Sequence, residues 1–374
     1  MALVLFGFSF IKNGRSLVLA TDGLSQHAPI VGYYGEYLRT ILRNIFVNHS
    51  FEIPMFDFSI GLGSDIVSTL HYYGLGDPLN LLYVFVPIKY TEYMYGVLCV
   101  LRMYLCGLGF SFFMLNRGRN VQATVTGAIA YAFCGFSIMC TIAHPFFISG
   151  LMYCPLIFMG IDLILSKKSP VLYIISIALL ISTNFYFAYM TCIMMLFYAA
   201  LRFFELNKGV WKKTLAPTIG KFALYTINAF LIPMVIFLPQ INNVLSTGRL
   251  NADNYVGVFY SPSYYATLLD SVTNPASNMS YSLLGFTGVS FLCIIVCFVH
   301  FRKHKNTAIG FLISIVAILF PVFGHIMNGF AYVTNRWSWI FSFIAAVAVS
   351  NCYDELFELE NKEKKCYGLF VPHI

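Results

Sequence analysis

Charged residues are scarce in this sequence. Only 10% of its 374 residues are Asp, Glu, Lys or Arg, whereas 59% are hydrophobic, and the mean hydropathy is +0.74. Ordinary soluble domains contain roughly 25% charged residues. The composition therefore excludes an ordinary soluble domain and indicates that lipid is the solvent for most of the chain.

Paired cysteine motifs are also missing. The sequence has ten cysteines but no C-x-x-C pair, so the spacing predicts neither a zinc site nor a disulfide framework. Eight of the cysteines stand inside apolar runs, where a thiol acts as a small hydrophobic group: Cys99, Cys106, Cys134, Cys140, Cys154, Cys192, Cys293 and Cys297.

Long apolar runs recur along the sequence. A bilayer core of about 30 Å needs about 20 mostly apolar residues per helix, and this criterion predicts an all-α integral membrane protein with about nine or ten transmembrane helices. The expected spans are residues 1–12, 93–115, 121–142, 145–165, 170–186, 187–204, 218–238, 283–301, 307–327 and 336–352.

Basic residues gather at alternate connections between these spans. By the positive-inside rule those connections are cytoplasmic, which places the N-terminus inside the cell membrane and the opposite connections outside. One topology satisfies every basic cluster, so we interpret the net charge of +7 as a sorting signal with some contact to anionic lipid, not as a nucleic-acid surface. The clusters are Arg117 with Arg119, Lys167 with Lys168, Lys208 with Lys212 and Lys213, Arg302 with Lys303 and Lys305, and Lys362 with Lys364 and Lys365.

The first outer connection, residues 13–92, is predicted to be a structured extracellular loop. It is far longer than a plain turn, and loops beyond about 15 residues are usually functional or disordered. It carries Tyr, Phe, Gly and Pro in patterns unlike those of a disordered tail. Residues Gly32 to Val47 show helical periodicity, with Tyr33, Tyr37, Ile41 and Ile45 on one side, which predicts a helix along the membrane surface.

Both ends of the sequence look incomplete. The apolar run 1–11 would rise only about 16 Å as a helix, which is short for a span, and Lys12 follows the run instead of preceding it as in a signal peptide. Residues 353–374 form a charged tail that the topology places in the cytoplasm. We expect a fragment or a shortened reading frame.

The densest polar segment of the first loop is Thr21 to His27. A transferase that uses a lipid phosphate donor needs a carboxylate near the outer membrane surface to take a proton from the acceptor hydroxyl, and Asp22 is placed for that task. The alternative is that Asp22 only caps the helix that follows, since Asp is favoured at helix starts.

A second polar segment runs from Ser59 to Asp65, and His71 to Pro78 follows it. Its two glycines, Gly61 and Gly63, would let backbone amides approach a ligand, and Asp65 could share a metal or an acceptor with Asp22. A tight turn that leads into an aromatic packing surface explains the same residues equally well.

Two arginines are predicted at or near membrane depth, where charge is costly and usually functional. Either Arg102 or Arg336 could pair with a lipid-linked phosphate, or could form an interhelical salt bridge or reach the interface. His144 and Asn184 stand at two other outer turns and would surround the same outer face as Asp22.

Several short motifs, taken in order, resemble the bacterial YfhO-like membrane proteins. They are Asp22-Gly23 with Gln26, Gly61-Leu62-Gly63-Ser64-Asp65, His71-Tyr72-Tyr73 with Asp77-Pro78, His144-Pro145 with Pro155-Leu156, Asn184-Phe185-Tyr186-Phe187, Phe259-Tyr260-Ser261-Pro262, Asn328-Gly329-Phe330 and Asn335-Arg336-Trp337.

The resemblance implies a GT-C-like helical bundle over residues 1–352 and an inverting glycosyltransferase. Such an enzyme would move a sugar from an undecaprenyl phosphate carrier to an envelope polymer such as lipoteichoic acid, on the outer face of the membrane. It implies Asp22 as the catalytic base and Asp65 as the second carboxylate, with or without a divalent metal held by the two. The expected substrate-binding residues are Gln26, His27, His71, Tyr72, His144, Asn184, Asn335 and Arg336.

The sequence departs from the family in length, because typical members continue with more spans after the stretch that matches Asn335-Arg336-Trp337. It would then hold the catalytic half without the acceptor-binding half. Two alternatives stay open. One is a transporter or flippase of a lipid-linked sugar or envelope polymer, although we find no internal repeat and the polar segments do not lie at mid-membrane positions. The other is a non-catalytic scaffold.

Overall fold

The computed structural model describes residues 6–246, 256–274 and 279–358. Within these ranges the chain is helical apart from one two-stranded antiparallel ribbon, β1 (Phe56–Asp57) with β2 (Ser64–Asp65). The prediction of an all-α polytopic membrane protein is confirmed. The chain divides into two compact units, Met1–Leu105 with Ile138–Asn254, and Cys106–Ser137 with Tyr255–Ile374.

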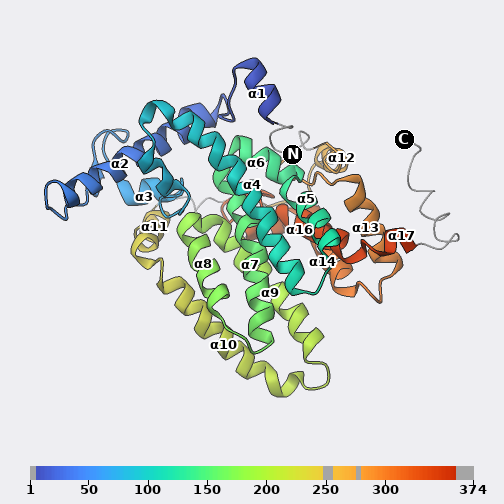
Figure 1. Cartoon of the computed structure of the whole chain (residues 1–374). Helices are drawn as coiled ribbons and strands as arrows, with labels where there is room; N and C mark the ends of the chain where they lie inside the picture. Colours follow the sequence, from blue (N-terminus) through green and yellow to red (C-terminus); the bar gives the residue numbers. More distant parts are fainter. Residues whose placement is uncertain (1–5, 247–255, 275–278, 359–374) are drawn as a thin grey trace. The chain divides into compact units, whose positions relative to one another are not determined.

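The first unit is built on a helical bundle. Its helices are α7 (Ser149–Leu165), α8 (Val171–Thr183), α9 (Phe185–Leu206) and α10 (Trp211–Leu231); α7 packs on α8 and α9, and α8 packs on α10 (Figure 1). A Cβ on Gly160 would lie 2.7 Å from Cα of Tyr173. A glycine is therefore needed where α7 and α8 approach, as is common between membrane helices.

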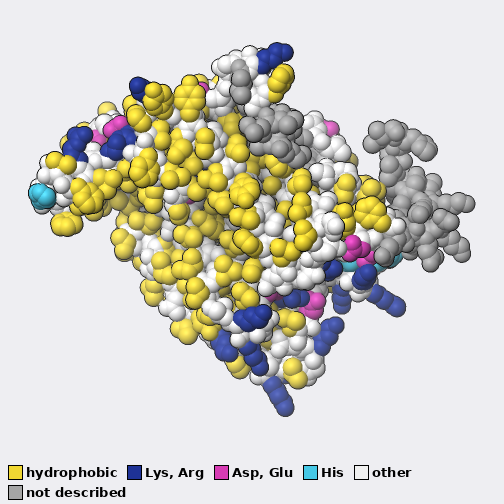
Figure 2. Space-filling model, in the orientation of Figure 1, with side chains coloured by type: hydrophobic (Ala, Val, Ile, Leu, Met, Phe, Trp, Pro, Cys, Tyr) yellow, Lys and Arg dark blue, Asp and Glu magenta, His cyan; other side chains and the backbone are white. Residues whose placement is uncertain are grey.

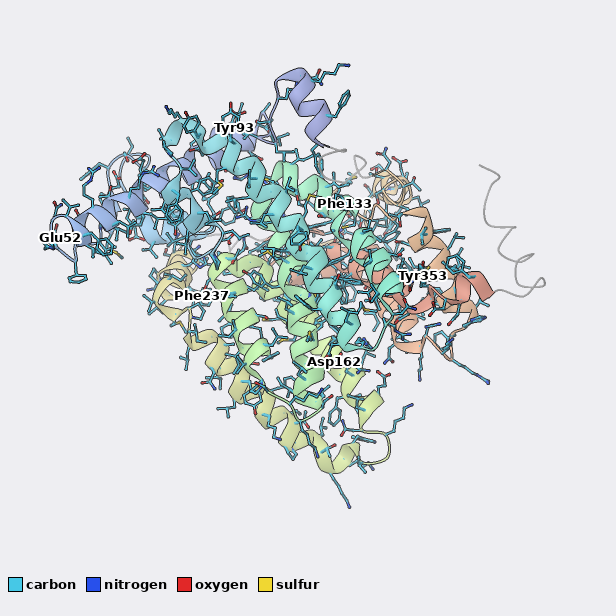
Figure 3. All side chains as sticks on the ribbon, viewed as in Figure 1. Glu52, Tyr93, Phe133, Asp162, Phe237 and Tyr353 are labelled. Carbon is cyan, nitrogen blue, oxygen red and sulfur yellow. The ribbon has the colours of Figure 1, made fainter. Side chains whose placement is uncertain are left out.

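An ion pair ties α7 to α9 inside this bundle. Arg202 Nε donates to Asp162 Oδ1 at 2.8 Å, and the Tyr198 hydroxyl donates to Asp162 Oδ2 at 2.9 Å. Figure 3 shows Asp162 among the helices of the bundle, where it is 5% exposed. These hydrogen bonds to both oxygens offset the free-energy cost of removing the carboxylate from water.

The first loop is a folded layer, as the sequence predicted. Its core element is α2 (Ala28–Phe46), which confirms the predicted helix and packs Tyr34 and Tyr37 against α3 (Ile66–His71). The hydroxyl of Tyr37 donates to Pro54 O at 2.9 Å, and Arg39 Nη1 donates to three carbonyls of residues 83–86. The other elements of the loop are the helical turns η2 (Gly23–His27), η3 (Asn80–Phe85) and η4 (Ile88–Tyr90).

The second unit is centred on α16 (Trp339–Cys352), which is buried along almost its whole length. It packs against α5 (Val121–Ala132), α13 (Gly288–Val299) and α14 (Lys305–Leu319). Ser350 Oγ donates to Ala123 O at 3.0 Å, and a Cβ on Gly127 would collide with Ser350. Small residues again allow close helix packing.

Nine of the ten predicted spans correspond to helices of the structure. The other, residues 1–12, lies partly outside the described residues, and its described part contains most of α1 (Phe8–Asn13). Among the described residues, three helices are long and apolar enough to cross a membrane alone: Ile88–Asn116, Pro145–Leu165 and Phe185–Leu206. Three bent pairs also qualify if each is one span, and three apolar helices, α8, α13 and α16, are shorter. The helix Ile88–Asn116 consists of η4 followed by α4 (Thr91–Asn116). The helix Pro145–Leu165 consists of η5 (Pro145–Ile148) followed by α7.

Two predicted spans are broken by sharp bends. Residues 218–238 fall on α10 and α11 (Met234–Ser246), which meet at 87°, and residues 307–327 fall on α14 and α15 (Pro321–Met327), which meet at 99°. Each break lies at a proline, Pro233 or Pro321, which lacks the N–H that continues a helix. Before Pro321 the backbone of Phe320 is also extended, as is usual before proline. The third bent pair is α5 with α6 (Gly135–Ala143).

Hydrophobic side chains cover much of the visible surface (Figure 2). Lys and Arg side chains gather at the end of the first unit's bundle where the α7–α8 and α9–α10 connections lie. Since α7, α8 and α9 run in alternating directions, the turns at His144 and Asn184 lie at the opposite end. The orientation of these two ends across the membrane remains a prediction from the positive-inside rule.

Candidate functional site

Asp22 lies at the start of the short helical turn η2. Its side chain makes no capping hydrogen bond within the described part of the chain; instead Gln26 Nε2 donates to Asp22 Oδ1 at 3.0 Å. The Asp22 side chain is 42% exposed. The alternative in which Asp22 serves only as a helix cap therefore does not describe its contacts.

Two histidines continue from Asp22 into the protein. Nε2 of His144 lies 3.7 Å from Asp22 Oδ2, and Nδ1 of His144 lies 3.1 Å from His27 Nε2. His144 is 16% exposed and His27 is 3% exposed. The three side chains form a row that runs from the surface into the interior.

Aromatic rings enclose the inner end of this row. The Tyr73 hydroxyl donates to Gln26 Oε1 at 2.9 Å, and the ring of His27 lies edge-on to Phe146 at 5.3 Å between centroids. We refer to Asp22, Gln26, His27, Tyr73 and His144 as the Asp22 cluster. Tyr73 was not among the predicted site residues, since nothing in its local sequence separates it from the many packing tyrosines.

The backbone of η2 brings the cluster together. Residues 23–27 form a π-helical turn that leads directly into α2, a rare conformation that often occurs at functional sites. A Cβ on Gly23 would lie 3.1 Å from Val18 Cγ1, so glycine lets the turn pack on the preceding segment. The turn directs Gln26 back to Asp22 and His27 inward to His144.

The turns at His144 and Asn184 lie beside this cluster. His144 has a non-helical backbone, in keeping with the proline that follows it, and its ring stacks on Phe147 at 4.6 Å between centroids. Phe147 contacts Phe187, whose backbone N donates to the side chain of Asn184. Asn184 therefore caps α9 beside the aromatic wall of the cluster and does not contact Asp22 itself.

His27 is neutral at physiological pH. Burial, helped by the neighbouring His144, lowers the pKa of His27 to about 4, because a buried imidazolium loses hydration. Burial likewise raises the pKa of Tyr73. A neutral His27 can share a hydrogen bond with His144 without adding a positive charge beside it.

Asp65 has a different environment from Asp22. It caps α3, because Asp65 Oδ1 accepts from Ser68 N at 2.7 Å, and in the described part of the chain it shares no hydrogen bond with Asp22. The glycine segment before it forms the tight turn between β1 and β2, with Gly63 at φ +110° against Phe56. The helix start engages Asp65 Oδ1 and leaves Oδ2 for a ligand, so a metal shared by Asp22 and Asp65 stays a prediction.

His71 and Tyr72 lie within the first loop, at the end of α3. His71 is fully buried between Phe185 and Phe237, and neither ring nitrogen has a hydrogen-bond partner among the described residues. Figure 3 shows Phe237 on α11. The Tyr72 ring lies edge-on to Tyr73 at 5.1 Å. Tyr72 thus adjoins the Asp22 cluster, whereas His71 packs against a different set of rings.

Acidification is expected to destabilise the protein through His71. Burial lowers the pKa of His71 to about 4 from 6.5, so between these two values the unfolded state binds more protons, and stability falls as the pH drops from about 6.5 to 4. The loss amounts to about 3 kcal/mol when complete. His71→Phe should reduce the fall in melting temperature between pH 7 and pH 4.5, measured on purified protein in detergent.

The matched control for this prediction is His49→Asn, at an exposed histidine in the left-handed conformation, which Asn tolerates. It should leave the pH dependence unchanged. Equal pH dependence in His71→Phe and the unsubstituted protein would contradict the prediction.

A buried ion pair fixes the segment that follows Tyr73. Arg102 Nη2 donates to Asp77 Oδ2 and to Asn80 Oδ1, both at 2.7 Å, and all three side chains are at most 4% exposed. Asn80 Nδ2 in turn donates to Gly74 O at 2.9 Å. Of the two interpretations of Arg102, the structure shows the salt bridge. It joins α4 to the loop that supports Tyr73.

The two remaining predicted residues lie in the second unit. Asn335 is fully buried and its amide nitrogen donates to the hydroxyls of Tyr260, Tyr264 and Ser282 at 2.9–3.0 Å. Arg336 is partly exposed, with its guanidinium 4.6 Å from the centre of the Tyr281 ring. Asn335 thus organises a buried network, while Arg336 keeps part of its surface accessible.

Comparisons with known proteins identify the family. The family described as "Bacterial membrane protein YfhO" matches residues 1–373. The "Uncharacterized protein YfhO" of Bacillus subtilis (strain 168) is 23% identical over 255 residues, which cover 66% of this chain and 27% of that protein. No solved structure matches. With a match over nearly its whole length, the chain belongs to the YfhO family of bacterial membrane proteins.

Proposed function

We propose that this chain carries the catalytic site of a membrane glycosyltransferase. It would move a sugar from a polyprenyl-phosphate carrier to a cell-envelope polymer, such as lipoteichoic acid, on the outer face of the membrane. The observation that carries the proposal is the Asp22 cluster: a half-exposed carboxylate with one oxygen bonded by Gln26 and the other facing a row of two histidines.

The arrangement suits a general base. Gln26 orients Asp22 through Oδ1, and the 3.7 Å separation from His144 leaves Oδ2 uncommitted to a full hydrogen bond. Asp22 takes the proton of an acceptor hydroxyl, whose oxygen bonds to the anomeric carbon. The bond from that carbon to the carrier phosphate breaks, and its electron pair leaves with the phosphate. Attack opposite the leaving group inverts the anomeric centre.

The donor phosphate calls for a positive group. Arg336 is proposed as a phosphate-binding residue of the second unit, since a planar guanidinium binds phosphate oxygens through two parallel hydrogen bonds, and its side chain is partly exposed. Arg336→Lys keeps the positive charge but loses the planar guanidinium. If Arg336 binds the donor phosphate, this variant should bind the donor more weakly, which is measured as a higher KM for the donor.

The test is sugar transfer in membranes that carry this chain, supplied with a labelled undecaprenyl phosphate sugar. The alignment covers 27% of the Bacillus relative, so a full-length family member is measured in parallel. Label in envelope polymer supports the proposal. Movement of the labelled carrier across the membrane without transfer to polymer would favour the flippase instead.

His144→Asn should reduce transfer about tenfold, because it removes the ring that lies between Asp22 and the buried His27, and leaving a buried polar group without its partner costs on the order of 1–3 kcal/mol. The reduction should appear in kcat with little change in KM, since His144 acts through Asp22 and not on the donor. His49→Asn is the control. An unchanged kcat in His144→Asn would remove His144 from the mechanism.

A further inference from the structure

Three potential metal ligands come together at one end of the second unit. Cys297 lies in the last turn of α13, His304 stands directly before α14, and Cys352 is the last residue of α16. Their ligand atoms all lie within 4.8 Å of one another, and the two sulfur atoms are 3.4 Å apart. All three residues are at most 5% exposed.

The donor set favours zinc. Two thiols and an imidazole are ligands that Zn²⁺ prefers, at about 2.3 Å for sulfur and about 2.0–2.1 Å for nitrogen. Two sulfurs on one tetrahedral ion are then about 3.8 Å apart, close to the separation observed. Small adjustments of side chains would bring all three groups onto one ion.

A carboxylate supports the imidazole of this set. Glu355 accepts from His304 Nε2 at 2.8 Å and also contacts His300 Nδ1 at 2.9 Å and Lys303 Nζ at 2.6 Å. Histidines that bind metals commonly contact a carboxylate that fixes the ring orientation. Glu355 is held in that position by partners from the α13–α14 connection.

The two cysteines lie in apolar surroundings, where a divalent ion would neutralise their charge. Cys297 and Cys352 belong to an apolar cluster with Ile294, Val296 and Val349, where two thiolates without a cation would be costly. One divalent ion neutralises both. The nearby basic residues, Arg302, Lys303 and Lys305, assign this end to the cytoplasm by the positive-inside rule, where thiols stay reduced.

We propose that Cys297, His304 and Cys352 bind a structural zinc ion that ties together the ends of α13, α14 and α16. Glu355 orients His304, and solvent or Glu355 itself completes the four-coordinate shell typical of zinc. The proposal concerns the fold of the second unit and is independent of the proposed transferase activity.

The test is metal content of the full chain, purified in detergent from zinc-replete cells. Elemental analysis should find about one zinc per chain, as one site requires, and Cys297→Ser or Cys352→Ser should lose it. Cys293→Ser is the matched control, because Cys293 is equally buried one turn earlier on α13. Cobalt loaded in place of zinc should show thiolate charge-transfer absorption that is absent from the two ligand variants.

Two further measurements cover variants that fail to fold. Glu355→Gln should lower zinc affinity by about 10- to 100-fold, as expected for a residue that orients a ligand, and a chelator should lower the melting temperature of the unsubstituted protein. Absence of zinc binding with added zinc, equal zinc content in Cys352→Ser and Cys293→Ser, or a Cys297–Cys352 disulfide in protein from the cytoplasm would each overturn the proposal.

Discussion

Asp22→Asn is expected to abolish sugar transfer while leaving a folded protein in the membrane. Asn keeps the shape of the side chain and can still bond Gln26, but it cannot accept the proton of an acceptor hydroxyl. General base catalysis contributes about 10²- to 10⁴-fold, so transfer should fall by that factor. Transfer is measured in membranes with equal amounts of each variant.

Glu52→Gln is the matched control for Asp22→Asn. It removes one negative charge from the same loop, at an exposed residue (Figure 3) that belongs to no part of the Asp22 cluster. Its transfer should equal that of the unsubstituted protein. Full transfer by Asp22→Asn would exclude Asp22 as the base, and equal losses in both variants would point to the loop charge instead.

Asp77→Asn is expected to have the largest effect on stability. The change leaves the Arg102 guanidinium buried without its counter-ion, and breaking a buried ion pair from one side costs about 3–5 kcal/mol. Arg102→Met should cost a similar amount, since it leaves the fully buried Asp77 carboxylate unpaired. Unfolding of the purified protein in detergent, followed by denaturant titration, measures both.

The double variant Asp77→Asn/Arg102→Met tests whether the two residues act as a pair. It should lose clearly less than the sum of the single losses, because the second change removes the charge that the first one stranded. Glu36→Gln breaks the exposed pair Arg39–Glu36 and should cost about 0–1 kcal/mol. A similar small cost for Asp77→Asn would contradict the structural role of the buried pair.

Hydropathy predicted the helices well because lipid imposes a simple condition on each of them. A span must be apolar over a fixed length, and the continuous helices Ile88–Asn116, Pro145–Leu165 and Phe185–Leu206 satisfy that condition. The bends at Pro233 and Pro321 were not predicted, since an average over 20 residues does not register where the backbone turns. The two prolines were the feature of the sequence that could have predicted the bends.

The sequence alone did not show how the two acidic candidates differ. The sequence left open whether Asp22 caps a helix and whether Asp65 joins it on a ligand; the structure shows Asp65 as the cap and Asp22 without a capping bond. The helix behind Asp65 is six residues long, too short for its periodicity to be seen. The helical periodicity of the sequence begins at Gly32, whereas α2 begins at Ala28. The periodicity therefore gave no indication of the turn that holds Asp22.

Contacts between distant residues lay beyond the sequence. His27 and His144 are 117 residues apart, and topology alone could predict only that they share a face of the membrane. The same holds for Cys297, His304 and Cys352, which come from three helix ends. Their sequence neighbours carry no short-spaced motif, so cysteine spacing gave no indication of a common site.

The π-helical turn at residues 23–27 also makes the length of this segment a determinant of the site. A π turn accommodates one residue more than an α-helical turn, and each residue of an α-helix rotates the chain by about 100°. If one residue were lost here, the turn could close as regular helix, and Asp22 would swing about a third of a circle away from His144 while His27 stayed in place. A homologue could therefore keep both residues and still lack their alignment if its spacing differed by one.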